Sequence, residues 1–302
     1  MAKEKQSKNR ENEQVVVSLK AKALAFLKEV GIVLGAFLLL NNFVVASFLV
    51  PTGSMENEVL TGDLLFVNKF IYGGTSPRNI PFTNVRLPWF RVPAIRDVER
   101  GDVIVFEFPG YREEVNPEEF QFYLKRCVGL PGDTIQVIDR VLYVNGSPAP
   151  LPRNLKFSDL ARVPDGVPDE RVFPPGSEWN EDNYGPLVVP YRGMKILLQN
   201  TTYRKWETFI KREGHQIWRV ADRVFVDGTP VNEYTVEHDY LFGMGDHRDN
   251  SLDSRYWGFI PKENLVGSPL LVYWSWDTNI PLYDIFGRVG SIRWNRVGTV
   301  IR

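Results

Sequence analysis

The stretch SFLVPTGSMENEVLTGD, residues 47–63, follows directly on the apolar run VGIVLGAFLLLNNFVVA, residues 30–46. Between residues 30 and 50 the clearly polar side chains are Asn41, Asn42 and Ser47. As a helix this segment would be about 31 Å long, which matches the hydrocarbon core of a bilayer. We therefore predict a transmembrane helix over residues 30–50, with the hydroxyls of Thr52 and Ser54 directly beyond it.

Basic residues are distributed unequally about this segment. They are frequent before it, whereas Lys69 is the only one from 51 to 70. Because the cytoplasmic flanks of membrane helices are enriched in basic residues, we expect residues 1–29 in the cytoplasm and residues 51–302 on the outer side of the cell (inner) membrane. Two alternatives fit less well. A cleaved signal peptide ending at Ala46 leaves a long charged leader unexplained, and a buried soluble helix would show an apolar stripe.

Composition argues against several classes of function. At 302 residues, with 43% hydrophobic residues, the chain can bury a core, and a formal net charge of −1 gives no support for a nucleic-acid partner. Cys127 is the only cysteine, so an internal disulfide is impossible, and the three histidines lack the spacing of a zinc site. Glycine motifs that bind phosphate are missing from the sequence as well. We therefore expect no metal and no cofactor.

Beyond residue 51 the sequence changes to short runs rich in β-branched and aromatic residues, separated by turn signals, as in DVIVFEF (102–108). This pattern predicts a mostly β fold with an antiparallel domain. DRVLYVNGSPA (139–149) and DRVFVDGTPVN (222–232) each place Asn-Gly or Asp-Gly between two strand segments, which predicts β-hairpins. A proline-rich span predicts a smaller irregular subdomain, inserted over about residues 148–240.

Ser54 becomes a nucleophile only if a base removes its proton. One candidate base is His247, which lies between aspartates in GDHRDNSLDSRYWG (245–258) and could form a Ser-His-Asp arrangement. The other is Lys125, which lies between apolar residues in FYLKRCVGLPGD (122–133). A strand that points this lysine inward would remove water from its ammonium and lower its pKa, leaving a neutral amine. The alternative is an exposed lysine paired with an acid, and the residues alone leave the choice open.

Four segments resemble, in order and spacing, the conserved boxes of bacterial type I signal peptidases, also called leader peptidases. They are VPTGSM (50–55), GDVIVFEFP (101–109), YLKRCVGLPGD (123–133) and GDHRDNSLDSRYWGFIP (245–261). The similarity extends from about Val30 to Trp276. The resemblance implies a membrane-bound serine endopeptidase with an antiparallel β catalytic domain, which removes signal peptides from secretory preproteins after an Ala-x-Ala site.

The resemblance also implies roles for individual residues. Ser54 would be the nucleophile and Lys125 the general base. Thr52 would offer its hydroxyl to the oxyanion, and Ser251 would orient the lysine. The charged residues that brace the site would be Arg126, Asp246, Asp253 and Arg255. The residues that line the shallow substrate subsites would be Phe48, Val50, Met55, Tyr123 and Leu124.

Two features depart from the family pattern. His247 stands where many relatives have asparagine, and one membrane helix is expected where some members have two. Neither departure removes Ser54 or Lys125. A self-cleaving protease of the LexA type is disfavoured, because a membrane helix stands where a DNA-binding segment would be needed. The alternative function is a membrane-tethered β domain that binds a partner without catalysis, and it predicts that Ser54→Ala has no effect.

Overall fold

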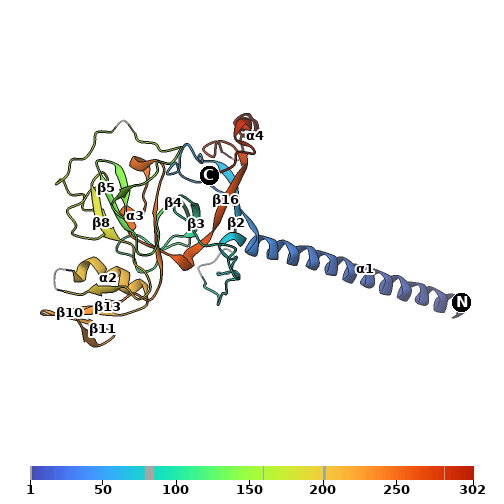
Figure 1. The fold of residues 1–302 in the computed structure, drawn as a ribbon. Coiled ribbons are helices and arrows are strands. Elements are labelled where there is room, and N and C mark those ends of the chain that lie inside the picture. The colour runs from blue at the N-terminus through green and yellow to red at the C-terminus, as the bar shows by residue number, and fades with distance from the viewer. Residues whose placement is uncertain (1, 79–84, 159, 200–201, 282) are drawn as a thin grey trace.

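The computed structural model describes residues 2–78, 85–158, 160–199, 202–281 and 283–302. A long helix, α1 (Ala2–Phe43), projects from a body that is built mainly of β-strands (Figure 1). The N-terminus lies at the far end of this helix, and the C-terminus lies on the body. The mostly β fold with an N-terminal apolar helix confirms the predicted fold class.

The apolar part of α1 lies further toward the N-terminus than predicted. Ala21–Phe43 form a span of 23 residues with a mean hydropathy of 2.1, and this span is not buried in the body. Within the described part of the chain, it is the one helix long and apolar enough to cross a membrane. The helix predicted over residues 30–50 was wrong in its bounds, because α1 ends at Phe43 and strand β1 occupies Val45–Leu49. Hydropathy could not separate the two, since apolar helices and apolar strands have similar compositions.

The body is organised around a seven-stranded sheet in the order β1-β2-β16-β3-β4-β14-β15, in which each neighbouring pair is antiparallel. The strands are β1 (Val45–Leu49), β2 (Asp63–Asn68), β3 (Val103–Glu107), β4 (Phe122–Gly129), β14 (Tyr240–Met244), β15 (Ile260–Pro261) and β16 (Leu265–Ser275). Register shifts where β16 meets β2 and β3 curve the sheet. Strands from the beginning of the body (β1 to β4) and from its C-terminal part (β14 to β16) therefore pair in one sheet.

Strand β4 lies inside this sheet, between β3 and β14. All five residues of β3 are buried, as is the second half of β4. Ile104 and Phe106 of β3 belong to one apolar cluster, and Val103 and Val105 belong to another. Alternating side chains of a strand point to opposite faces, so the sheet is covered on both. Short helices complete this region: α3 (Ser254–Trp257), η1 (Phe70–Tyr72), η2 (Arg248–Asn250), η3 (Lys262–Asn264) and η4 (Trp294–Arg296).

Between β4 and β14 the chain forms an insertion. Its four-stranded sheet has the order β7-β6-β5-β8, formed by β5 (Thr134–Ile138), β6 (Val141–Val144), β7 (Ser147–Pro148) and β8 (Tyr184–Val188). The other elements are β9 (Lys195–Leu197), α2 (Tyr203–Arg212), β10 (Ile217–Val220), β11 (Arg223–Val226), β12 (Thr229–Val231) and β13 (Glu233–Thr235). The insertion starts before the expected boundary at residue 148, because β5 pairs with β6 and β8 and lies outside the main sheet.

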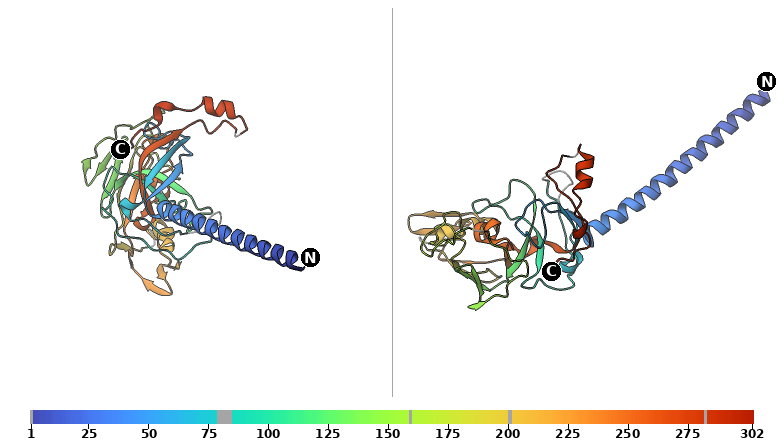
Figure 2. Two further views of the ribbon diagram at one scale, coloured as in Figure 1. Left: turned by 90° about the vertical axis from the view of Figure 1, so that its right-hand side faces the viewer. Right: turned by 90° about the horizontal axis from the view of Figure 1, so that it is seen from above.

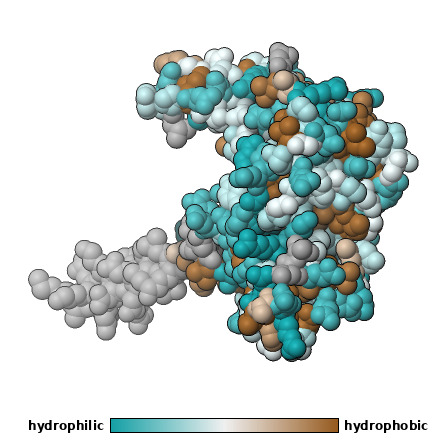
Figure 3. All heavy atoms as spheres, turned by 90° about the vertical axis from the view of Figure 1, so that its left-hand side faces the viewer, coloured by the Kyte–Doolittle hydropathy of each residue, from teal (hydrophilic) through white to brown (hydrophobic). Residues whose placement is uncertain are grey.

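Both predicted hairpins are present in this insertion, where β6 pairs with β7 and β11 pairs with β12. The turns have positive φ angles at Asn145 (55°), Gly146 (78°), Asp227 (48°) and Gly228 (84°). Asparagine, aspartate and glycine tolerate this left-handed conformation, which is why these dipeptides predicted the turns. The face of the molecule formed by the insertion carries interspersed hydrophilic and apolar residues (Figure 3).

After β16 the chain forms a projecting segment that contains the short helix α4 (Ile285–Gly290). Large apolar side chains are exposed on this segment, with Tyr283 at 87% and Phe286 at 93%. The segment projects from the body on the side from which α1 leaves it (Figure 2). Phe90, which is also exposed, packs its ring 5.8 Å from that of Phe43 at the end of α1. Phe90 therefore places an exposed aromatic ring beside the end of the apolar helix.

Candidate active site

Ser54 lies on the loop that links β1 to β2. Val50 closes the base of this loop, because its N–H donates to Asp63 O and its carbonyl accepts from Gly62 N. The next residue, Met55, is buried in the apolar cluster beside β2 and β3. These contacts hold the loop on both sides of Ser54, whose own area is 8% exposed.

Lys125 reaches Ser54 from strand β4. Its Nζ lies 2.6 Å from Ser54 Oγ, and 3% of its area is exposed. Burial removes water from the ammonium and lowers the pKa of Lys125 to about 8, although the negative charge of Asp253 opposes the shift. About one tenth of the lysine is then neutral at pH 7, against roughly one part in three thousand for an unperturbed lysine. The amine is therefore suited to accept the proton of the serine hydroxyl.

Two further hydroxyl residues, Thr52 and Ser251, line the same groove as Ser54 and Lys125. The hydrogen bond expected from Ser251 to the lysine is not formed, since the buried Ser251 Oγ has no hydrogen-bond partner among the described residues. A Cβ at Gly245 would lie 2.2 Å from Ser251 Oγ and 2.6 Å from Ser54 O. Only glycine fits between the two serines, so the loop of Ser251 packs directly on the nucleophile loop.

Two buried ion pairs hold the strand and the loop that form the site. Arg126, the residue after the lysine, donates from Nε and Nη2 to the two oxygens of Asp246, at 2.8 and 2.6 Å. Arg255 forms a similar fork with Asp253, which also accepts from the backbone N–H of Gly245. Each carboxylate is almost fully buried, so each depends on its guanidinium partner. All four charged residues expected near the site are thus brought there in pairs.

A groove with a volume of about 1270 Å³ runs past Ser54 and Lys125. Its lining includes all five residues expected at the substrate subsites: Phe48, Val50, Met55, Tyr123 and Leu124. Most of these come from β1 and β4 or from the residues next to them. Other parts of the lining are charged and include Arg171 and Glu181 of the insertion. The groove therefore combines an apolar region beside β1 with a polar region contributed by the insertion.

The ring nitrogens of His247 are engaged by residues other than Ser54. They lie 2.9 Å from Ser158 Oγ and 3.1 Å from Glu56 Oε2. The contact between the histidine and the serine is a backbone one, in which His247 N donates to Ser54 O at 3.1 Å. The geometry therefore favours Lys125 over His247 as the base. Sequence reasoning did not identify Glu56 and Ser158 as neighbours of the histidine, because segments far apart in the chain bring them together.

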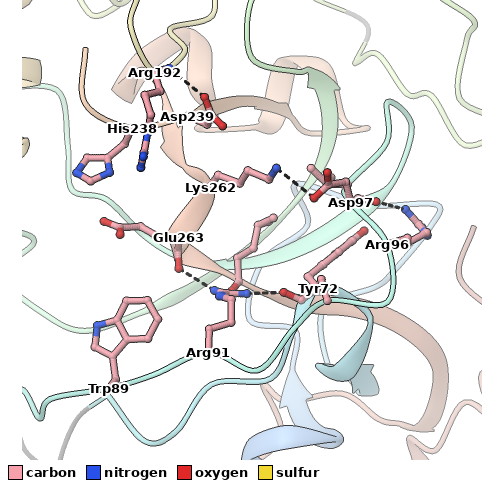
Figure 4. A pocket seen from close by; sticks show the side chains of 13 residues that line it. Tyr72, Trp89, Arg91, Arg96, Asp97, Arg192, His238, Asp239, Lys262 and Glu263 are labelled. Carbon is pink, nitrogen blue, oxygen red and sulfur yellow. Dashed lines mark hydrogen bonds and ion pairs between the residues drawn. The ribbon is translucent and has the colours of Figure 1, made fainter. Parts of the chain in front are cut away.

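A second hollow of about 380 Å³ lies elsewhere on the body, and several of its charged side chains have partners within the fold (Figure 4). Arg91 donates to the carbonyls of Tyr72 and Glu263, at 2.7 and 2.8 Å. Lys262 lies 3.1 Å from Asp97. These contacts join the loop before β3 to the segment around β15. The larger groove, which contains Ser54 and Lys125, is therefore the candidate active site.

The described residues contain no group of three or more His, Cys, Asp or Glu side chains arranged to hold a metal ion. Cys127, on β4, is buried, and burial raises the pKa of its thiol to about 12. Such a thiol stays protonated and unreactive at neutral pH. The expectation that no cofactor is needed stays a prediction from composition.

Known proteins resemble this chain over most of its length. Residues 23–274 match the family model described as signal peptidase, peptidase S26. A signal peptidase I from Pseudomonas aeruginosa is 31% identical over 274 residues, which cover 86% of this chain and 76% of that protein. One from Rickettsia bellii is 30% identical, with 86% and 79% covered. A crystal structure of a signal peptidase I from Enterococcus faecalis is 21% identical, covers 58% of this chain and 98% of its own, and has a TM-score of 0.26.

The family match and these relatives define a serine endopeptidase, which is a hydrolase. The chain belongs to the signal peptidase family, peptidase S26, whose activity is the removal of signal peptides. Its exposed apolar helix α1 agrees with anchorage in a membrane.

Proposed function

We propose that this chain cleaves secretory preproteins after an Ala-x-Ala site, with Ser54 as nucleophile and Lys125 as general base. The observation that carries the proposal is the 2.6 Å distance between Lys125 Nζ and Ser54 Oγ, two atoms that line an open groove. The lysine is buried while the groove is accessible, so a substrate can reach the serine while the amine keeps its lowered pKa.

In the acylation step, Ser54 Oγ attacks the scissile carbonyl carbon and passes its proton to the neutral amine of Lys125. The oxyanion of the tetrahedral intermediate accepts from the Ser54 backbone N–H and from the Thr52 hydroxyl. When the C–N bond breaks, the Lys125 ammonium returns the proton to the leaving amine, which is the new N-terminus of the mature protein. In deacylation, the lysine amine takes a proton from water, and the water oxygen attacks the carbonyl carbon of the serine ester. The bond from this carbon to Ser54 Oγ then breaks, Lys125 returns the proton to Ser54 Oγ, and the carboxylate of the signal peptide leaves.

The residues around the dyad keep it in place. Asp246 and Asp253, each held by a buried arginine, fix the ends of the loop that carries Ser251. The Ser251 hydroxyl is buried and has no partner among the described residues, so it is free to orient the amine of Lys125 as the proton moves. In this proposal the insertion is not part of the dyad, because Ser54 and Lys125 both precede it in the chain.

The groove supports selection of small side chains in the substrate. Its apolar lining residues Phe48, Val50, Met55, Tyr123 and Leu124 fill the space beside the dyad with bulky groups. Alanine fits such shallow subsites, whereas a large side chain would clash with them. We expect the preprotein to bind in extended form at a sheet edge, with main-chain hydrogen bonds giving affinity and the subsites giving selectivity.

The apolar helix α1 supports a membrane location beside the substrate. We propose that the residues before the apolar span Ala21–Phe43 lie in the cytoplasm and that the body, which begins at β1, lies on the outer side of the cell (inner) membrane. Ser54 would then meet the cleavage site of a signal peptide held in the same bilayer at a high effective concentration. The segment that contains α4 projects on the side of α1 (Figure 2), and lipid on that side would cover its exposed Tyr283 and Phe286.

Incubation of the full-length protein in detergent with a purified preprotein tests this function. N-terminal sequencing of the product should show one cut, directly after the second alanine of Ala-x-Ala. A matched preprotein with tryptophan in place of that alanine should resist cleavage, because its side chain does not fit the shallow subsite. Equal cleavage of both preproteins would exclude the proposed specificity. The activity itself would be excluded if this protein left the preprotein intact while another signal peptidase cut the same preprotein.

A further inference from the structure

A cluster of polar side chains holds the loop that carries Ser54. His247 contacts this loop twice. Its backbone N–H donates to Ser54 O at 3.1 Å, and its ring Nδ1 lies 3.1 Å from Glu56 Oε2. The ring contact is at ion-pair distance but is not aligned as a hydrogen bond. The nucleophile and the residue two positions after it are thereby tied to one histidine.

The insertion reaches the same histidine from the other side. Nε2 of His247 lies 2.9 Å from Ser158 Oγ, in the segment 154–158. Within this segment Lys156 forms a parallel backbone bridge with His247, and Lys156 N donates to Asp246 O at 2.9 Å. The segment 154–158 therefore runs along the loop that faces the nucleophile.

Glu56 joins the two sides of this cluster. Its carboxylate lies 3.0 Å from Lys156 Nζ and 3.1 Å from His247 Nδ1. The hydrogen bond from Lys156 and the nearby positive charges lower the pKa of Glu56, so the carboxylate is ionised at neutral pH. The loop of Ser54, the loop of His247 and the insertion thus meet at the carboxylate of Glu56.

We propose that Glu56 and His247 are positioning residues that keep Ser54 Oγ opposite Lys125. This role rests on the Ser-Lys dyad proposed above. Lys125 is fixed by its strand, whereas Ser54 lies on a loop and needs contacts of its own to hold the distance. The described residues that line the groove include neither Glu56 nor His247, so the pair acts through the backbone of Ser54 and not on the substrate.

The cluster also connects to the strand that carries the base. Asp246, which accepts from Lys156 N, is held by Arg126 on β4, next to Lys125. A displacement of about 1 Å between reacting groups is enough to slow catalysis about 100-fold. Loss of the cluster should therefore lower the rate of the chemical step without weakening substrate binding.

The test measures kcat and KM for cleavage of a preprotein by the full-length protein in detergent. His247→Ala should lower kcat about 10- to 100-fold and leave KM within about two-fold of the wild type. His247→Asn, whose amide can donate to Glu56 or Ser158, should recover most of the lost kcat. Glu56→Gln keeps the shape of the side chain and should lower kcat by about 3- to 10-fold. The double variant His247→Ala with Glu56→Gln should cost little more than His247→Ala alone.

His215→Ala is the matched control, because His215 also lies between two carboxylates, those of Asp227 and Glu237, but on the insertion. Its kcat should equal that of the wild type. If the Glu56→Gln variant had the same kcat as the wild type, the positioning role would be overturned. This variant decides the question if His247→Ala does not fold. A loss confined to KM would overturn it as well. Activity retained in Ser54→Ala would instead show that the dyad is wrong, which separates the two failures.

Discussion

Lys125 Nζ lies 2.6 Å from Ser54 Oγ, although 71 residues separate the two in the chain. The lysine extends from a strand inside the main sheet, and the serine lies on the loop after the first strand. Both residues are buried, so the lysine loses hydration and its pKa falls to about 8. The contact therefore brings a hydroxyl and a partly neutral amine together at physiological pH.

Removal of either member of this pair should abolish cleavage. We expect Ser54→Ala and Lys125→Ala each to lower kcat/KM by about 10⁴-fold or more, and the double variant to cost little beyond either one. The reason is that a nucleophile and its base act as one unit. Steady-state kinetics with a preprotein checks this expectation. Multiplicative effects in the double variant would show that the two residues act independently.

Lys125→Arg should be as inactive as Lys125→Ala, although it keeps the positive charge. A guanidinium stays protonated throughout the accessible pH range and cannot take the proton of Ser54. The measurement is single-turnover cleavage of a preprotein by the folded variant. Appreciable activity in Lys125→Arg would mean that this position supplies only charge.

The pH dependence of kcat/KM should follow the lowered pKa of Lys125, which is about 8. In the proposed mechanism the neutral amine is the active form, so activity should be low at pH 6, rise through pH 8 and level off above it. An unperturbed histidine would instead give a rise near 6.5. A pH profile of cleavage, recorded with a control for enzyme stability at each pH, distinguishes the two bases.

Asp253→Asn should destabilise the fold. The change leaves the guanidinium of Arg255, 2% exposed, without its carboxylate, and the loss of one partner of a buried ion pair costs about 3–5 kcal/mol. Glu233→Gln is the control, since it breaks an ion pair with Lys195 whose two side chains are largely exposed, and it should cost about 1 kcal/mol or less. Urea unfolding of both variants gives the comparison, and equal midpoints would contradict it.

The anchor hypothesis predicts that the full-length protein stays in the membrane fraction after a carbonate wash. Protease added from the outer side should digest the body and leave α1 protected by the bilayer. Immunoblots against tags at the two ends would follow each part. Recovery of a soluble chain that starts near Ser47 would favour a cleaved signal peptide instead.

The sequence by itself determined the local features. The apolar run predicted a membrane helix, Asn-Gly and Asp-Gly predicted the turns of both hairpins, and the ordered motifs indicated the family. The same motifs named residues that the fold brings together at one groove. These features depend on neighbouring residues, or on short motifs in a fixed order, and so can be recognised in the chain itself.

The tertiary structure decided what depends on contacts between distant segments. α1 ends at Phe43 because the next apolar residues pair with β2, and hydropathy carries no information on that pairing. The proposal of Lys125 as base in preference to His247 rests on the burial of the lysine and on the direction of the histidine ring. The contact of His247 with Glu56 was also hidden, because it forms only where the loops meet. Distances and desolvation arise from the packing of segments far apart in sequence, and no local pattern encodes them.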